Sequence, residues 1–141
     1  MRMWMVAPVT MCRQHLYGEH VELHMFLGTL RKLKSVQGYI DNNLLEIKSM
    51  QRRHAALVYE MMRRMILAGR QSGHSSRLTN KMIEEVEPHY SHIIDFEIDR
   101  QSSAADLFGR CAECSKRREL AITFGVNSLQ AFFRHNHQGD L

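Results

Sequence analysis

The sequence predicts an all-α fold, because apolar residues recur at helical spacing and residues that favour loops are scarce. Five leucines follow one another at intervals of three, four or seven residues, as they do along one side of an α-helix: Leu16, Leu23, Leu27, Leu30 and Leu33. Only two prolines and eight glycines occur among 141 residues, of which 44% are apolar. We therefore expect one compact domain over residues 1–141, with about three main helices, an N-terminal strap that threads between them, and an uncertain tail over residues 121–141.

The N-terminal strap is expected to be extended and to lead directly into the first helix. It covers residues 1–10 and is ended by Pro8. Thr10 belongs to the residue types that cap helix N-termini. The first helix should then run from about Met11 to Lys34.

A second helix is predicted after a loop. Gly38 and the polar run 41–43 indicate the loop. The helix itself should run from about Ser49 to Leu67, because apolar residues and one histidine form a stripe along it: Met50, His54, Leu57, Met61 and Met65.

The second half of the chain begins with a polar link over residues 69–76. A short helix from Asn80 to Val86 should follow and end before the next proline. A third long helix should start near Ser102 or Ser103 and carry three side chains inward: Leu107, Cys111 and Cys114.

Charge is distributed unevenly along the chain. Residues 31–81 hold eleven lysines and arginines against three acidic residues, a balance of +8, whereas residues 82–99 hold six acidic residues and no lysine or arginine. A basic segment of this strength is typical of proteins that bind a phosphate backbone. The alternative is a pair of solvated basic helix faces.

Other sequence features limit the class of protein. The chain has no apolar run of 18 residues, so no transmembrane helix is expected. It has no charged-then-apolar leader, and its three cysteines are odd in number, which fits reduced thiols in a cytoplasm. We expect a monomer in the cytoplasm of a bacterial host cell, encoded either by the host or by a phage.

Two glutamates mark the first helix as a candidate site. At 100° per residue, Glu19 and Glu22 fall with His15 on one flank of the leucine stripe. A carboxylate at the border of a core is partly desolvated, which raises its pKa towards the range used in proton transfer. A solvated glutamate pair is the alternative. His20 lies on the stripe and is expected to be a core residue, while His54 fits either a core or a site role.

The same helix carries a family resemblance. The run Gln14-His15-Leu16, followed by Glu19, Glu22 and Leu23 and then by Gly28-Thr29-Leu30-Arg31-Lys32, resembles the phage and algal-virus pyrimidine-dimer DNA glycosylases, the UV-damage endonuclease type. Weaker likenesses in residues 51–64, 74–78 and 99–117 extend it to about residue 118. The resemblance implies a DNA repair glycosylase with apurinic/apyrimidinic lyase activity, without a cofactor, that acts on pyrimidine dimers or on another damaged or modified base.

The resemblance also implies a catalytic pair. The nucleophile of this family is the free α-amine of the mature N-terminus, which forms an imine, or Schiff base, with deoxyribose C1′. If Arg2 matches the family's arginine, Met1 supplies that amine. Glu22 matches the catalytic glutamate, which stabilises the sugar cation or moves the C2′ proton. An α-amine suits this role because it ionises near pH 8, well below a lysine side chain.

The expected partner is double-stranded DNA. Seven residues are the candidates for contacting it: Arg2, His15, His24, Arg31, Lys32, Arg52 and Arg53. The family also carries arginines just before the catalytic glutamate and three residues after it, where this chain has Val21 and Met25. This departure keeps a second interpretation open, a non-catalytic helical phage protein that binds DNA or protein and has kept the fold.

The pair Cys111 and Cys114 has the spacing of two metal ligands. His135 and His137 are the histidines that would complete a four-ligand zinc set. The same spacing also fits two ordinary core cysteines on a helix, and we expect no metal.

Overall fold

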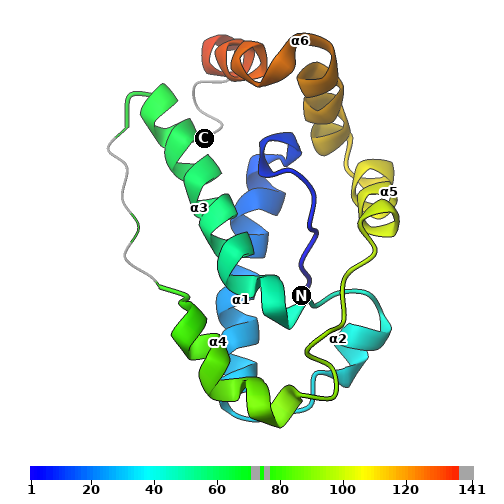
Figure 1. Cartoon of the computed structure of the whole chain (residues 1–141). Coiled ribbons are helices and arrows are strands. Elements are labelled where there is room, and N and C mark those ends of the chain that lie inside the picture. Colours follow the sequence, from blue (N-terminus) through cyan, green and yellow to red (C-terminus); the bar gives the residue numbers. More distant parts are fainter. Residues whose placement is uncertain (71–73, 75–76, 137–141) are drawn as a thin grey trace.

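The computed structural model describes residues 1–70, 74 and 77–136, with side chains as far as Gly125. Within these residues it contains six α-helices and no strand, so the all-α prediction is confirmed. The α-helices, shown in Figure 1, are α1 (Arg13–Arg31), α2 (Gln37–Asp41), α3 (Met50–Leu67), α4 (Asn80–Val86), α5 (Arg100–Arg110) and α6 (Ala112–Asn136). Three short 3-10 helices join them: η1 (Pro8–Thr10), η2 (Ile47–Ser49) and η3 (Glu87–Tyr90).

The core lies where α1 packs against α3 and α4. Leu16, Leu23 and Leu30 of the predicted stripe are fully buried, and Phe26 is buried beside them. Leu33 is the exception, because it is half exposed and has a positive φ of 56° in the turn that ends α1. Helix α1 therefore stops at Arg31 and not at Lys34.

The helix starts differ from the prediction in α1 but agree in α4. Thr10 does not cap α1, because its hydroxyl donates to the carbonyl of Ala7 inside η1, and Cys12 occupies the cap position instead. Thr79 caps α4 as expected for this residue type, since its hydroxyl accepts the N–H of Met82. At the other boundary of the polar link, Gly69 ends α3 with a φ of 73°.

Two predicted features are wrong. The loop expected at Gly38 contains the short helix α2, and the third long helix is two helices, because Cys111 is extended, with a φ of −116° and a ψ of 107°. Helix α5 starts at Arg100, before the expected Ser102 or Ser103, with Asp99 as the cap that accepts the N–H of Ser102. Ser103 is buried. Within α6, Gly125 is non-helical and kinks the helix.

The N-terminal segment, residues 1–7, runs between α3 and α5 (Figure 1), and its extended backbone is interrupted at Met5, where φ is 57°. Its backbone is bonded on both sides. The N–H of Met3 donates to the carbonyl of Leu44 at 2.8 Å, and the carbonyl of Trp4 accepts the hydroxyl of Ser103 on α5. The side chains of Met3 and Trp4 are buried. The predicted threaded strap is therefore present over residues 1–7.

A buried ion pair fixes this segment to the two central helices. Glu19 on α1 and Arg53 on α3 are only 1% and 6% exposed, and the guanidinium of Arg53 binds both oxygens of the Glu19 carboxylate. The same carboxylate accepts the N–H of Trp4 at 2.7 Å, and Arg53 also donates to the carbonyl of Val6. Arg53 was expected to contact DNA, but its charge is used inside the protein, so this expectation is corrected.

Within the described residues, no helix combines the length and the apolar character that crossing a membrane requires.

Replacing Arg53 by alanine should lower the free energy of unfolding by about 3 to 5 kcal/mol, because the carboxylate of Glu19 would stay buried without its partner. Urea unfolding followed by circular dichroism measures this. Arg52→Ala is the matched control, since Arg52 is the exposed neighbour and should cost less than about 0.5 kcal/mol. Equal losses in the two variants would show that the pair does not hold the segment.

Candidate active site

A pocket of about 530 Å³ lies between the N-terminal segment and α1. The N-terminus itself forms part of its wall, because Met1 and Arg2 line it together with Glu22. Trp4 and His15 contribute ring surface, and Arg110 reaches the pocket from α5. The pocket thus combines an α-amine, a carboxylate and a guanidinium.

Glu22 contacts the N-terminus directly. It lies one helical turn after Glu19, on the same side of α1, and its carboxylate Oε2 accepts the backbone N–H of Arg2 at 2.9 Å. Because the α-amine of Met1 is separated from this N–H by one residue, backbone dimensions put the amine within about 7 Å of the carboxylate. The half-buried Glu22 and the N-terminus therefore occupy one site.

The side chain of Arg2 is turned towards α5. Its guanidinium donates to Asp106 at 2.6 Å and to Ser103 at 3.1 Å, and lies 3.6 Å from the ring centre of Trp4. Only 15% of the side chain is exposed. Arg2 was expected to hold a phosphate, but these contacts make it a residue that positions the N-terminus against α5.

Arg110 is a pocket cation that sequence analysis missed. Its guanidinium is paired with Asp106 at 2.6 Å and lies 5.5 Å from the ring of Trp4, and 58% of its side chain is exposed. Nothing in the local sequence distinguishes Arg110 from other arginines on a helix. Only the packing of α5 against the N-terminal segment brings it to the pocket.

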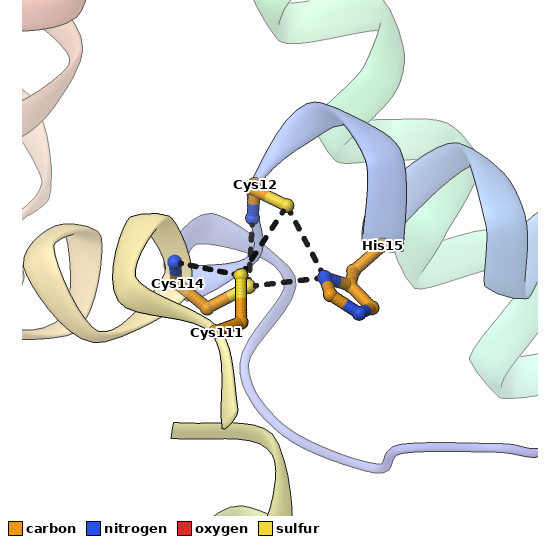
Figure 2. Close-up of side chains that lie close together, drawn as sticks. All are labelled: Cys12, His15, Cys111 and Cys114. Carbon is orange, nitrogen blue, oxygen red and sulfur yellow. Dashed lines mark hydrogen bonds between the residues drawn. The ribbon is translucent and has the colours of Figure 1, made fainter. Parts of the chain in front are cut away.

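His15 lines the pocket but its ring nitrogen Nδ1 faces cysteines, as Figure 2 shows. Nδ1 lies 3.2 Å from the sulfur of Cys12 and 3.6 Å from that of Cys114. With Cys111, these residues form a group whose four ligand atoms all lie within 4.8 Å of one another, so the group could hold a metal ion. A hydrogen bond with Cys114 and interactions with His15 lower the pKa of the Cys12 thiol to about 4 despite its burial.

The structure gives the cysteine pair two partners that the sequence did not suggest. Cys12 and His15 complete the group, whereas His137 and the side chain of His135 lie outside the described residues. The sequence carries no signal that α6 begins beside the start of α1, and this packing brings Cys12 and His15 to the cysteine pair.

A second group contains four histidines, from α1, α3 and the link. The Nε2 atoms of His20 and His74 are 2.7 Å apart, and those of His24 and His54 are 3.0 Å apart. All four rings offer a nitrogen within 4.8 Å of the others, which would also suit a metal ion. His24, expected to contact DNA, is thus engaged with other histidines, and His20 is 9% exposed in agreement with the expected core position.

Three of the expected DNA contacts are exposed cations. Arg31 and Lys32 lie at the end of α1, and Arg52 lies near the start of α3. On α1, the apolar residues Val21 and Met25 flank Glu22 and are 54% and 52% exposed. The surface beside the carboxylate is therefore apolar at these two positions.

One family model matches this chain. It is described as pyrimidine dimer DNA glycosylase, and it matches residues 1–68. The match confirms, over these residues, the resemblance seen in the sequence. No curated protein and no solved structure matches the chain.

The part that matches the pyrimidine dimer DNA glycosylase family extends from the N-terminal segment to the end of α3. It includes Met1 and Glu22, and with them the α-amine and the carboxylate of the pocket. Arg110 and the cysteine pair of α6 lie outside it, so they are features of this chain that the family model does not describe.

The histidine group should make the stability of the metal-free protein depend on pH. Burial, and then repulsion from neighbouring histidines, lowers the pKa of both His20 and His54 to about 4. An unfolded histidine titrates near 6.5, so between these values the unfolded chain binds protons that the folded chain does not. The free energy of unfolding should therefore fall as the pH drops from about 6.5 to about 4.

Urea unfolding at a series of pH values measures this dependence. His54→Gln removes one titrating ring and should flatten the fall, whereas His92→Gln changes an exposed histidine outside the group and should leave it unchanged. An identical fall in His54→Gln and in the native protein would show that other groups cause it.

Proposed function

We propose that this chain is a DNA glycosylase with apurinic/apyrimidinic lyase activity, in which the α-amine of Met1 is the nucleophile and Glu22 is the proton acceptor. The observation that carries the proposal is the 2.9 Å hydrogen bond from the N–H of Arg2 to Glu22, which holds the N-terminus beside this carboxylate. The family match over residues 1–68 supports it. Double-stranded DNA is the proposed partner, and a monomer in the bacterial cytoplasm is the proposed active form.

The proposed reaction begins with the neutral amine. Its lone pair attacks deoxyribose C1′, the bond from C1′ to the base breaks, and the base leaves with the bonding electrons and takes up a proton. Loss of an amine proton and cleavage of the C1′–O4′ bond then give a protonated imine. Because an α-amine ionises at lower pH than a lysine, a useful fraction is neutral at pH 7.

Glu22 is the proposed base of the second step. The protonated imine makes the C2′ protons acidic, and a carboxylate within reach removes one of them. The freed electrons form the C2′–C3′ double bond, and the C3′–O bond breaks to release the 3′ phosphate. Water then hydrolyses the imine and restores the amine. In the first step, the negative charge of Glu22 stabilises the cationic sugar.

Exposed cations around the pocket are proposed to hold the DNA backbone. Arg110 lies in the pocket wall. Arg31 and Lys32 follow Glu22 by nine and ten residues, which is about 14 Å along α1, and Arg52 is exposed on α3. Arg2 and Arg53 are not included, because their guanidinium groups are bonded inside the protein.

The proposed substrate is a pyrimidine dimer or another damaged or modified base. Exposed Val21 and Met25 beside Glu22 favour looser contact with phosphates than two arginines would give. The same observation favours the second candidate, a helical protein that binds DNA or protein without catalysis. The two candidates differ in whether abasic DNA is cleaved.

Replacing Glu22 by glutamine should lower cleavage of abasic DNA by about 10²-fold or more, because it removes the proton acceptor and the negative charge while keeping the shape. Duplex binding should change little. Gel assays with a labelled abasic duplex measure both quantities. Glu85→Gln, an exposed glutamate on α4, is the matched control and should cleave normally. Normal cleavage by Glu22→Gln would assign the base to another residue.

Adding one glycine before Met1 should abolish covalent trapping by borohydride on abasic DNA, because the amine would no longer lie next to Glu22. The native protein should form the adduct, which a denaturing gel resolves. Lys34→Ala, a variant of an exposed lysine that is not among the proposed DNA contacts, should trap as the native protein does. If the extended protein traps equally well and a lysine variant does not, a side-chain amine is the nucleophile.

A further inference from the structure

Three sulfurs and one imidazole converge at the junction of α1 and α6. Figure 2 shows Cys12 and His15 at the start of α1 facing Cys111 and Cys114 at the start of α6. The first pair, Cys12 and His15, is 96 or more residues away from the second pair, Cys111 and Cys114. Within each pair, two residues separate the two members. The three sulfurs are all the cysteine sulfurs in the chain.

We propose that these four residues bind one zinc ion and that the ion has a structural role, joining the N-terminal half of the chain to α6. The proposal does not depend on the proposed enzymatic activity. Cysteine thiolates and histidine nitrogens are the ligands of structural zinc, which is held by four protein groups in a tetrahedron.

The distances fit a single tetrahedral ion. Zinc lies about 2.3 Å from sulfur and about 2.0 Å from nitrogen, so the ligand atoms of a tetrahedron lie about 3.8 Å apart for two sulfurs and about 3.6 Å apart for sulfur and nitrogen. The sulfurs of Cys111 and Cys12 are 3.9 Å apart. His15 Nδ1 lies 3.2 Å from one sulfur and 3.6 Å from another. A cluster of several irons would need wider spacing, because its cysteines bind different metal atoms.

The backbone around the four residues is also arranged for thiolates. Cys12 is the N-cap of α1, and Cys111 directly precedes α6, so two helix N-termini point their N–H groups and their positive dipole ends at the sulfurs. The N–H of Cys12 donates to the sulfur of Cys114 at 3.1 Å, and that of Cys114 donates to Cys111 at 3.5 Å. Such bonds orient metal-bound sulfur and balance its charge.

Two buried arginines, one of which is also paired with Glu60 at 3.1 Å, bring a net charge of +1 close to the group. Three thiolates, one imidazole and Zn²⁺ carry a net charge of −1. Arg64 and Arg117 are 2% and 6% exposed and interact electrostatically with the cysteines. Arg64 donates to the carbonyl of Met11 at 2.7 Å, and Arg117 donates to that of Val9 at 3.0 Å, so both are fixed to the loop that precedes Cys12.

A disulfide is the competing explanation for close cysteines, and the geometry disfavours it. A disulfide would use two of the three sulfurs and would leave the third, and the histidine that faces them, without a role. The break between α5 and α6 also favours a metal. If Cys111 and Cys114 were only core residues, a continuous helix would place them equally well, whereas the extended backbone at Cys111 turns its sulfur towards Cys12.

The test is the metal content of untagged full-length protein, measured by inductively coupled plasma mass spectrometry after purification without chelator. We expect Cys12→Ser and Cys114→Ser each to lose one zinc ion per chain relative to the native protein. His15→Ala should lose the same ion, and His92→Ala, an exposed histidine outside both groups, should keep it. Undiminished zinc in the cysteine variants would overturn the proposal, because the metal would then sit elsewhere, for example on the four histidines.

A second measurement keeps the proposal testable if the variants do not fold. Native protein in which cobalt replaces zinc should show a thiolate-to-cobalt charge-transfer band, together with the visible bands of a tetrahedral ion. Only this group can produce the charge-transfer band, because the chain has no other cysteine. Absence of the band, native protein that carries no zinc or carries iron in its place, or a disulfide found by thiol titration of unreduced protein would each overturn the proposal.

Discussion

The position of the N-terminus depends on the buried carboxylate of Glu19. It accepts the N–H of Trp4 and the guanidinium of Arg53, so it fixes the register of the N-terminal segment against α1. In an extended chain the N–H groups of alternate residues point the same way, and in a helix residues three apart share a face. With Trp4 bonded to Glu19, the N–H of Arg2 therefore meets Glu22. The buried carboxylate of Glu19 thus places the α-amine of Met1 beside Glu22. The carboxylate of Glu22 stays accessible from the pocket.

The helical spacing of apolar residues and the positions of glycine and proline were sufficient to predict much of the fold. The apolar stripe of α3 and the proline that follows α4 predicted two helices whose observed bounds agree with those expected, within one residue for α3. The break at Cys111 could not be predicted, because the residues around it have ordinary helical patterning and the extended conformation is accompanied by contacts with Cys12, far away in the sequence. Resemblance identified Met1 and Glu22 as a pair, but Arg110 has no local signal and reaches the pocket only through tertiary packing.

Charge counting overstates the basic surface for a physical reason. It treats every arginine as solvated, whereas a protein of this size can bury an arginine whose donors are all paired. Arg53 and Arg64 both belong to the basic segment of residues 31–81, and both are buried against carboxylates and backbone carbonyls. Two of the eleven lysines and arginines of this segment are therefore not available to attract DNA. A site cation from α5, Arg110, lies outside the segment altogether.

The region that matches the family supplies only some of the bonds that hold the N-terminal segment. Glu19 and Glu22 bind one side of the N-terminal segment, but Ser103 binds the carbonyl of Trp4 from the other side. Arg2 is likewise held by Asp106. Without these two contacts, the carbonyl of Trp4 and the guanidinium of Arg2 would have to be solvated or left unpaired. Helix α5 supplies those partners, so the geometry around Met1 is a property of both halves of the chain, and the contacts between α1 and the start of α6 bear on the same site.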